Sequence, residues 1–151
     1  MSSRKYYLAY GSNLDRKAMA FRCPDARVAG MAILEDWKMA FKVHADIVPC
    51  EGRTVPVLVW EISERDEDSL DVYESYPRYY VKREFPVTMT DLEGRNPVTI
   101  TAMAYVMTEG HSLQEPSPFY YKILEDGYEA FGFDRRLLEL ALSEAKEGGH
   151  A

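Results

Sequence analysis

The strongest local structural signal in the sequence is the segment Lys5-Tyr-Tyr-Leu-Ala-Tyr-Gly-Ser-Asn-Leu14. Its first half is short, aromatic and apolar, which predicts a buried strand over residues 5–9. The following Tyr10-Gly-Ser-Asn13 is a turn-forming cluster. A short helix is expected from Asp15 to Phe21, ending before Pro24. The segment therefore predicts a strand that runs through a tight turn directly into a helix.

Beyond this segment, strands dominate the first part of the chain and helices dominate its end. The further strands are expected over residues 31–34, 37–43, 55–62, 79–89 and 98–107. Helices are expected over residues 64–74, 118–131 and 135–145, with Ser63, Ser117 and Asp134 as their caps. Strand and helix do not alternate as they do in a doubly wound parallel sheet. The sequence thus predicts an α+β fold with a curved, mostly antiparallel sheet.

Length and composition indicate a single ordinary globular domain. The 151 residues contain no internal repeat and no Gly/Ser-rich linker, so one domain over 1–151 with a core over about 5–145 is expected. The formal net charge of −7 would repel a phosphate backbone, which disfavours nucleic acid as a partner. Residues 1–10 lack the apolar stretch and the small-residue cleavage site that are typical of a signal peptide. The longest apolar run, Val55 to Trp60, contains Pro56 and is too short for a membrane span, so a cytoplasmic protein is expected.

Cysteine and histidine are sparse in this chain. Cys23 and Cys50 could form at most one disulfide, and there is no CxxC pair. His44, His111 and His150 lack the close spacing of metal ligands. Neither a metal site nor a redox centre is therefore expected.

The turn after the first strand is the first candidate binding site. Gly11 allows a ligand to approach the backbone closely, and the amides that follow lie at a helix start, which suits an anion such as a small carboxylate. The turn does not match a Walker loop or a nucleophile elbow. An ordinary strand-to-helix turn is the alternative interpretation.

Glu74 is the candidate acid–base residue. It lies four residues after Leu70 and next to Tyr73, so it shares the apolar face of the helix expected over 64–74. The helix dipole at this C-terminal end disfavours negative charge and would raise the pKa of the carboxyl group. An inward carboxyl group with a raised pKa suits general acid–base catalysis. A structural hydrogen bond is the alternative role.

Together, these residues resemble the γ-glutamylcyclotransferase family, which includes AIG2-like proteins. The opening motif of the family, aromatic-x-Ala-Tyr-Gly-Ser-Asn-Leu, corresponds to Tyr7-Leu-Ala-Tyr-Gly-Ser-Asn-Leu14. The later motifs correspond to Leu70-Asp-Val-Tyr-Glu74, Tyr80-Val-Lys-Arg-Glu84, Tyr105-Val-Met-Thr108 and Pro116-Ser-Pro-Phe-Tyr120. Their order and spacing hold from Tyr7 to about Leu142.

The resemblance implies a small mixed, mostly antiparallel β-barrel with peripheral helices, and a defined set of site residues. Glu74 would accept and donate the proton. The substrate-binding residues would be Tyr7, Leu8, Ala9, Tyr10, Gly11, Ser12, Asn13, Tyr105 and Tyr120, with Tyr80 as a further candidate. The loop would bind the γ-glutamyl head through backbone groups, and the tyrosines would supply hydroxyl groups or walls.

The implied reaction is an intramolecular cyclisation. The α-amine of the substrate attacks the γ-glutamyl amide carbonyl, which releases 5-oxoproline and a free amino acid or amine. No cofactor is needed, because the nucleophile belongs to the substrate and its proximity lowers the entropic barrier. The expected partner is a small γ-glutamyl molecule, not nucleic acid or membrane, and a homodimer is an open alternative to a monomer.

Two features of the sequence bear on the choice of substrate. Ser75 stands where the family usually has Gly, and its side chain would narrow or repolarise the mouth of the cavity. The loop reads Tyr-Gly-Ser-Asn rather than the Tyr-Gly-Thr-Leu-Lys of the γ-glutamylamine branch. Two alternatives share these residues: a non-catalytic ligand-binding module on the same fold, and a biosynthetic enzyme that removes a γ-glutamyl group. An inward acid at Glu74 favours an enzyme over a mere binding module.

Overall fold

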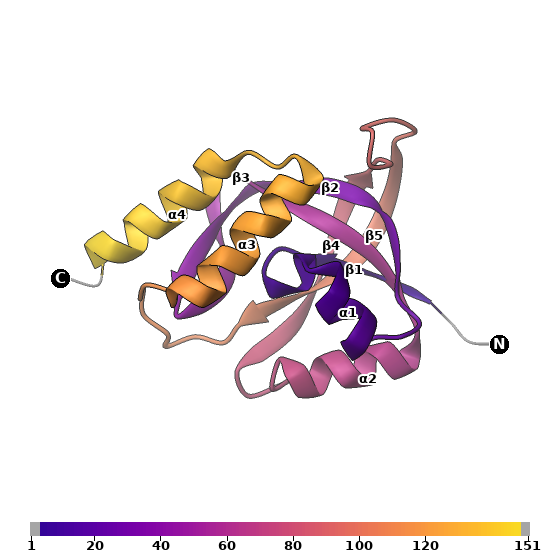
Figure 1. The fold of residues 1–151 in the computed structure, drawn as a ribbon, viewed down its shortest axis with the longest axis horizontal. Coiled ribbons are helices and arrows are strands. Elements are labelled where there is room, and N and C mark those ends of the chain that lie inside the picture. Colours follow the sequence, from indigo (N-terminus) through magenta and orange to yellow (C-terminus); the bar gives the residue numbers. More distant parts are fainter. Residues whose placement is uncertain (1–3, 149–151) are drawn as a thin grey trace.

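The computed structural model describes residues 4–148; residues 1–3 and 149–151, including His150, lie outside the described part. Two shorter helices interrupt the series of strands, and two long helices follow the last strand (Figure 1). The strands are β1 (Lys5–Ala9), β2 (Arg27–Lys42), β3 (His44–Ile62), β4 (Tyr80–Met89) and β5 (Val98–Met107). The helices are the 3-10 turn η1 (Ser12–Leu14), α1 (Arg16–Arg22), α2 (Glu64–Tyr73), α3 (Pro118–Phe131) and α4 (Arg135–Gly148).

The five strands form one mixed sheet in the order β2-β3-β1-β5-β4. β1 lies at its centre, antiparallel to β3 and parallel to β5, while the β2–β3 and β4–β5 pairs are antiparallel. The expected α+β class with a mostly antiparallel sheet is confirmed. Because β1 is central, the loop that follows it emerges in the middle of the sheet's end.

The sheet curls strongly, but its edges do not pair along their length as in a closed barrel. Within residues 4–148, β2 and the residue after β4 meet at one isolated bridge, Met31↔Thr90, with both N–H···O distances at 2.9 Å. The backbones approach so closely that a Cβ on Gly30 would lie 2.1 Å from the Thr90 carbonyl oxygen. The expected barrel is therefore an open, curled sheet that is fastened at this point.

β2 and β3 form one long hairpin, which the sequence did not indicate. The strands expected over 31–34 and 37–43 are one strand, and the strand expected from Val55 begins already at His44. The pairing shifts register between Glu35 and Trp37, where Asp36 has φ of 66° and accepts a hydrogen bond from the Gly52 N–H at 3.0 Å. Because the sequence around this bulge is polar and resembles a turn, it does not indicate that both strands continue through it.

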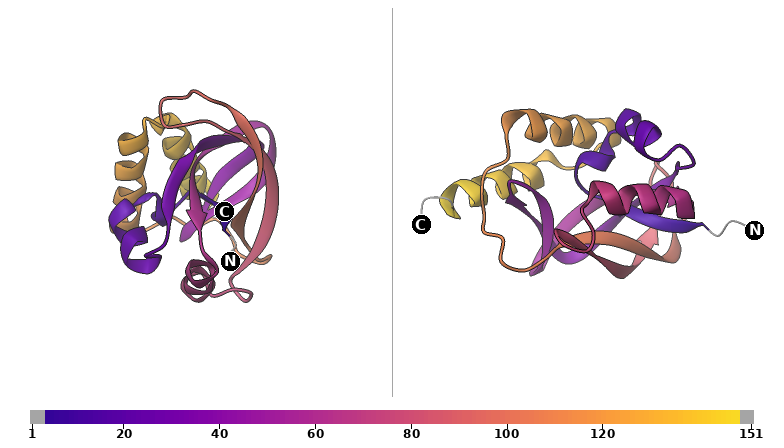
Figure 2. Two further views of the ribbon diagram at one scale, coloured as in Figure 1. Left: turned by 90° about the vertical axis from the view of Figure 1, so that its right-hand side faces the viewer. Right: turned by 90° about the horizontal axis from the view of Figure 1, so that it is seen from below.

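The helices lie on two sides of the sheet. Figure 2 shows α3 and α4 together along one side of the curled sheet and α2 along another, with α1 between α3 and α2. Salt bridges from Lys82 to Glu67 and Asp71, at 2.8 and 2.9 Å, attach α2 to β4. The largest fully buried side chains, such as Phe41, Leu58 and Tyr128, fill the interior between sheet and helices. The C-terminal end of α2 and the start of α3 thereby come to the same end of the sheet as the loop after β1.

Candidate active site

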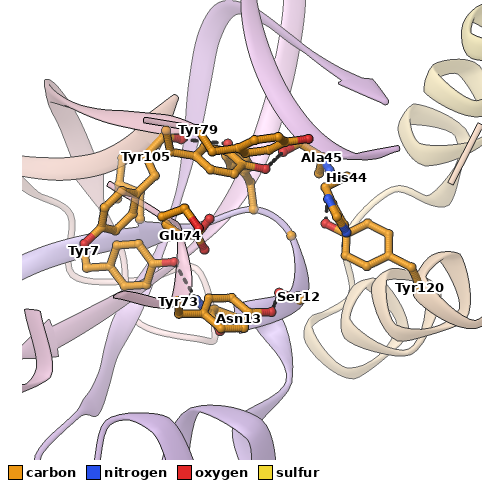
Figure 3. A pocket seen from close by; sticks show the side chains of 15 residues that line it. Tyr7, Ser12, Asn13, His44, Ala45, Tyr73, Glu74, Tyr79, Tyr105 and Tyr120 are labelled. Carbon is orange, nitrogen blue, oxygen red and sulfur yellow. Dashed lines mark hydrogen bonds between the residues drawn. The ribbon is translucent and has the colours of Figure 1, made fainter. Parts of the chain in front are cut away.

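A cavity of about 320 Å³ opens at the end of β1, a volume suited to a small ligand (Figure 3). Seven tyrosines and a single carboxylate line it. The full lining consists of Tyr7, Leu8, Tyr10, Gly11, Ser12, Asn13, His44, Ala45, Tyr73, Glu74, Ser75, Tyr79, Tyr80, Tyr105 and Tyr120. The cavity thus unites β1 and its loop with the start of β3, the end of α2, strands β4 and β5 and the first turn of α3.

The loop after β1 forms the floor of the cavity. Its residues turn into η1, where the Leu14 N–H donates to the Gly11 carbonyl at 3.0 Å and the Asp15 N–H to the Ser12 carbonyl at 3.1 Å. The Asn13 side chain is buried and donates to the Tyr7 hydroxyl at 2.9 Å. The first amides of such a turn have no partner within it, so those of Ser12 and Asn13 suit an anionic ligand group.

Glu74 is placed at the cavity by the length of α2. A capping box fixes the start of the helix: the Ser63 hydroxyl accepts from the Asp66 N–H, and the Asp66 carboxylate accepts from the Ser63 N–H, each at 3.2 Å. At the other end Glu74 is the C-cap, and its N–H donates to the Leu70 carbonyl at 2.8 Å. Figure 3 shows its carboxylate in the centre of the cavity, between Tyr7 and Tyr73.

The Glu74 carboxylate is half-buried and unpartnered. Within residues 4–148 it takes part in no hydrogen bond and no salt bridge. Burial raises its pKa to about 7, and the positive charge of Arg22 opposes part of that rise. The sequence predicted a raised pKa from the helix C-terminus and an apolar wall, and in the structure the largest cause is the loss of solvent around the carboxylate. Near neutral pH such a group can both accept and donate a proton.

Tyr120 and Tyr80 form a further wall of the cavity, and both hydroxyls contact the backbone of Ala45. The Tyr120 hydroxyl accepts from the Ala45 N–H at 3.0 Å, and the Tyr80 hydroxyl donates to the Ala45 carbonyl at 2.8 Å. Burial raises the pKa of both phenols, so both stay protonated. Since the Tyr120 oxygen already accepts a hydrogen bond, its own proton is left to donate to a ligand.

The predicted site residues come together at this cavity with one exception. Ala9 is buried in the core and is not among the lining residues. Tyr105 offers its ring, since its hydroxyl donates to Asp71 at 2.6 Å, and Tyr10 donates its hydroxyl to the Tyr105 carbonyl at 2.7 Å. Leu8 adds apolar surface to the lining.

Sequence reasoning missed His44, Ala45, Tyr73 and Tyr79 as lining residues. The His44 ring lies edge-on to Tyr120, with 5.1 Å between ring centroids, and faces Tyr79 at 6.3 Å. These residues lie at the start of β3, at the end of α2 and just before β4. Only the long β2–β3 hairpin brings His44 here, and no local motif signals that hairpin.

Ser75 occupies a left-handed backbone conformation, with φ of 52°. Such a φ is costly for a residue with a Cβ and free for glycine, which is the residue that the family resemblance leads us to expect at this position. The serine keeps the same turn: the Ser75 N–H donates to the Val72 carbonyl at 3.2 Å. Because Ser75 lines the cavity, its side chain adds bulk and a hydroxyl group at the mouth, next to Glu74.

Two further features to consider in the described residues are a metal site and a membrane-spanning helix. Residues 4–148 contain no group of three or more His, Cys, Asp or Glu placed to hold a metal ion. No helix in the same range is both long and apolar enough to cross a membrane. The cytoplasmic location and the homodimer stay predictions.

The cavity is lined by tyrosines and holds an unpartnered carboxylate together with the loop that contains Gly11. On this α+β fold, such a site defines a class of protein that binds a small ligand and is capable of acid–base chemistry. A family model described as "Gamma-glutamyl cyclotransferase, AIG2-like" matches residues 7–130. The chain therefore belongs to the γ-glutamylcyclotransferase family, and the resemblance seen in its motifs is confirmed.

Individual relatives agree with this assignment. The chain is 34% identical to the γ-glutamylcyclotransferase of Bos taurus over 131 residues, which cover 78% of this chain and 66% of the bovine protein. It is 32% identical to that of Mus musculus over 146 residues, 88% of this chain and 74% of the mouse protein. A solved structure titled "Gamma-glutamyl cyclotransferase" superposes with a TM-score of 0.76 at 29% identity, covering 92% of this chain and 86% of that one.

Proposed function

We propose that this protein is a γ-glutamylcyclotransferase that converts a γ-glutamyl compound to 5-oxoproline and a free amino acid or amine. The observation that carries the proposal is the Glu74 carboxylate, unpartnered at the cavity and with a pKa of about 7. A binding module has no need of such a group, whereas the cyclisation needs a base that can become an acid. The bovine and mouse relatives, which match most of the chain, are both named γ-glutamylcyclotransferase, and this supports the same reaction.

The substrate needs to be held bent, so that its α-amine reaches its own γ-carbonyl. We assign the α-carboxylate to the Ser12 and Asn13 amides, because these backbone donors lie at the floor of the cavity. The absence of a Cβ on Gly11 lets the loop pack closely against Tyr120 and Ala45 at the edge of the cavity. Anchoring the head in this way places the α-ammonium group on the side of Glu74.

Glu74 then takes a proton from the α-ammonium group, and the free amine attacks the γ-carbonyl carbon. The N–C bond closes the five-membered lactam, and the carbonyl oxygen becomes an oxyanion. Collapse of this intermediate breaks the bond to the leaving nitrogen, which receives the proton that Glu74 had accepted. Glu74 then takes the second proton from the ring nitrogen, which leaves the neutral lactam, and passes it to the leaving amine, which departs as an ammonium ion. One carboxyl group thus serves both steps and ends in its starting state.

The oxyanion needs hydrogen-bond donors, and two tyrosines have protons to give. The Tyr7 oxygen accepts from Asn13 at 2.9 Å and the Tyr120 oxygen accepts from Ala45 at 3.0 Å, so each O–H is left for the ligand. Burial raises the pKa of both hydroxyl groups, which keeps these protons in place. We assign oxyanion stabilisation to Tyr120, because Tyr7 lies on the Glu74 side of the cavity (Figure 3).

The test is release of 5-oxoproline from a panel of γ-glutamyl dipeptides, γ-glutamylamines and glutathione. Glu74→Gln is nearly isosteric but cannot accept the α-ammonium proton, so turnover is expected to fall by ~100- to 10,000-fold. Ligand binding and fold are expected to persist, as measured by calorimetry with the best substrate and by circular dichroism. Glu64→Gln, at the exposed start of the same helix, is the matched control. Activity of Glu74→Gln within a few fold of wild type would remove Glu74 from the mechanism.

A further inference from the structure

Arg22, the last residue of α1, contacts two parts of the cavity wall from outside the cavity. Its guanidinium group stacks on the Tyr73 ring, with Cζ 3.5 Å from the ring centroid. The same group donates a hydrogen bond to the Asn13 side-chain oxygen. Arg22 is half-buried, and within residues 4–148 it forms no salt bridge. Arg22 lies outside the sequence motifs that resemble the family.

Both contacts of Arg22 lead directly to functional positions. Asn13 lies in the carboxylate-binding loop and donates its amide to the Tyr7 hydroxyl at 2.9 Å. Tyr73 immediately precedes Glu74, and its hydroxyl is hydrogen-bonded to the Ser12 hydroxyl at 2.9 Å. The loop and the end of α2 are far apart in sequence, and the planar guanidinium group lies between them. Its flat face stacks on the ring while its edge donates, two contacts that a lysine ammonium cannot reproduce together.

We propose that Arg22 is a positioning residue that fixes the carboxylate-binding loop against the end of α2 and so sets the distance between the anchored substrate head and Glu74. The inference rests on the proposed function, because it assumes that the loop binds the α-carboxylate of the γ-glutamyl group while Glu74, at the end of α2, receives its α-ammonium group. Arg22 itself does not touch the substrate, since it is not among the residues that line the cavity.

The charge of Arg22 has a second effect, on the protonation of Glu74. The titratable groups that line the cavity with Glu74 from the other elements are Tyr7 of β1, Tyr10 of the loop, His44 of β3, Tyr79, Tyr80 of β4, Tyr105 of β5 and Tyr120 of α3. Burial raises the pKa of Tyr7, Tyr10, Tyr80, Tyr105 and Tyr120, so these phenols stay neutral. Arg22 supplies a positive field at the carboxylate, and it lowers the pKa that burial raises. Removal of this charge moves the pKa of Glu74 further upward.

Two substitutions separate position from charge. Arg22→Met removes the guanidinium group and its charge, while Arg22→Lys keeps the charge and loses the combined stack and hydrogen bond. Arg16→Met is the matched control: Arg16 begins the same helix and its guanidinium also lies over an aromatic ring, that of Phe131 at 5.2 Å, away from the cavity. For each variant, kcat and KM are measured across pH by 5-oxoproline release, with circular dichroism as the check on folding.

We expect KM to rise at least about tenfold in both Arg22 variants, the loss typical of one charge-assisted hydrogen bond. The lower limb of the kcat/KM profile moves to higher pH in Arg22→Met and stays near its wild-type position in Arg22→Lys. Arg16→Met changes neither. Wild-type KM and an unmoved limb in Arg22→Met would overturn the proposal. If Arg22→Met does not fold, wild-type KM in Arg22→Lys overturns it.

An activity-independent readout keeps this inference separate from the proposed function. The carbon-13 resonance of the Glu74 carboxyl group, assigned by its absence in Glu74→Gln, is titrated in wild type and Arg22→Met. An upward move of the midpoint supports the link between Arg22 and Glu74, and an unmoved midpoint contradicts it. If wild type releases no 5-oxoproline from any substrate, the proposed function fails, yet this titration still decides whether Arg22 acts on Glu74.

Discussion

The Tyr120 hydroxyl lies against the backbone of Gly11, so closely that a Cβ on Gly11 would be 3.2 Å from the phenolic oxygen. A Cβ there would also lie 3.4 Å from that of Ala45. Gly11 has φ of −121°, so glycine is not required here for a left-handed backbone. It is required for space: the loop after β1 and the first turn of α3 meet across this point and leave the cavity open between them.

Gly11→Val is expected to raise KM strongly while changing stability less. The branched side chain would push Tyr120 and Ala45 away from the loop and so distort the cavity between the loop and the first turn of α3. Steady-state kinetics and thermal unfolding measure the two effects separately. Gly11→Ala, with one methyl group, should show a smaller rise in KM. An unchanged KM in Gly11→Val would show that the loop is only a turn.

Tyr120→Phe is expected to lower kcat by about 100-fold or more, in the range seen when one oxyanion-hole donor is removed. The Tyr120 hydroxyl is committed to the Ala45 N–H only as an acceptor, so its loss removes the proton offered to the oxyanion. Tyr128→Phe is the matched control, because Tyr128 is buried on the same helix and does not line the cavity. Equal kcat in the two variants would exclude Tyr120 from oxyanion stabilisation.

The sequence predicts best what short-range chemistry decides. The Ser63 cap, the proline of Ser117-Pro118 and the left-handed Gly132 each mark a helix end, and all three stand where expected. Glu74 also ends its helix as predicted. These features depend on a few neighbouring residues, which a single sequence displays in full.

What the sequence could not show depends on contacts between distant segments. His44 reaches the cavity only because β3 extends past a bulge whose unpaired amide is satisfied by Asp36. Arg22 reads as an ordinary residue at the end of a short helix, and its contacts with Asn13 and Tyr73 exist only in the folded chain. The burial that raises the pKa of Glu74 likewise comes from packing, not from its own helix.

Ser75→Gly is expected to stabilise the protein by up to about 1 kcal/mol. A left-handed residue with a Cβ costs about 1–2 kcal/mol, which glycine avoids. The greater entropy of the unfolded chain with glycine offsets part of this gain. Chemical denaturation measures the difference. Asn96→Gly is the comparison, because Asn96 has a similar φ of 56° but tolerates it better. A loss of stability in Ser75→Gly would mean that the serine side chain makes a compensating contact.

Glu74→Gln is expected to be more stable than wild type at pH 8, and this advantage is expected to shrink as the pH falls. The pKa of Glu74 is about 7 when folded, against 4.5 as its ordinary value, so the folded chain binds the proton more tightly. The contribution of the Glu74 proton to wild-type stability is therefore fully present below pH 4.5 and is lost as the pH rises through about 7. The loss amounts to at most about 3 kcal/mol, and less with partial solvent screening. A pH-independent difference between the two proteins would contradict the raised pKa.

The same carboxyl group should govern the pH dependence of catalysis. As the free enzyme's Glu74 ionises, kcat/KM is expected to climb through a midpoint near 7. The substrate's α-ammonium group titrates near ~8. Because the loop site and Glu74 receive the ammonium form, kcat/KM should fall again above that value. The lower limb should be absent from any residual activity of Glu74→Gln, while the upper limb, which belongs to the substrate, should persist. A rate that rises with the free-amine fraction in both proteins would mean that bulk solvent takes the proton and the enzyme only holds the substrate bent.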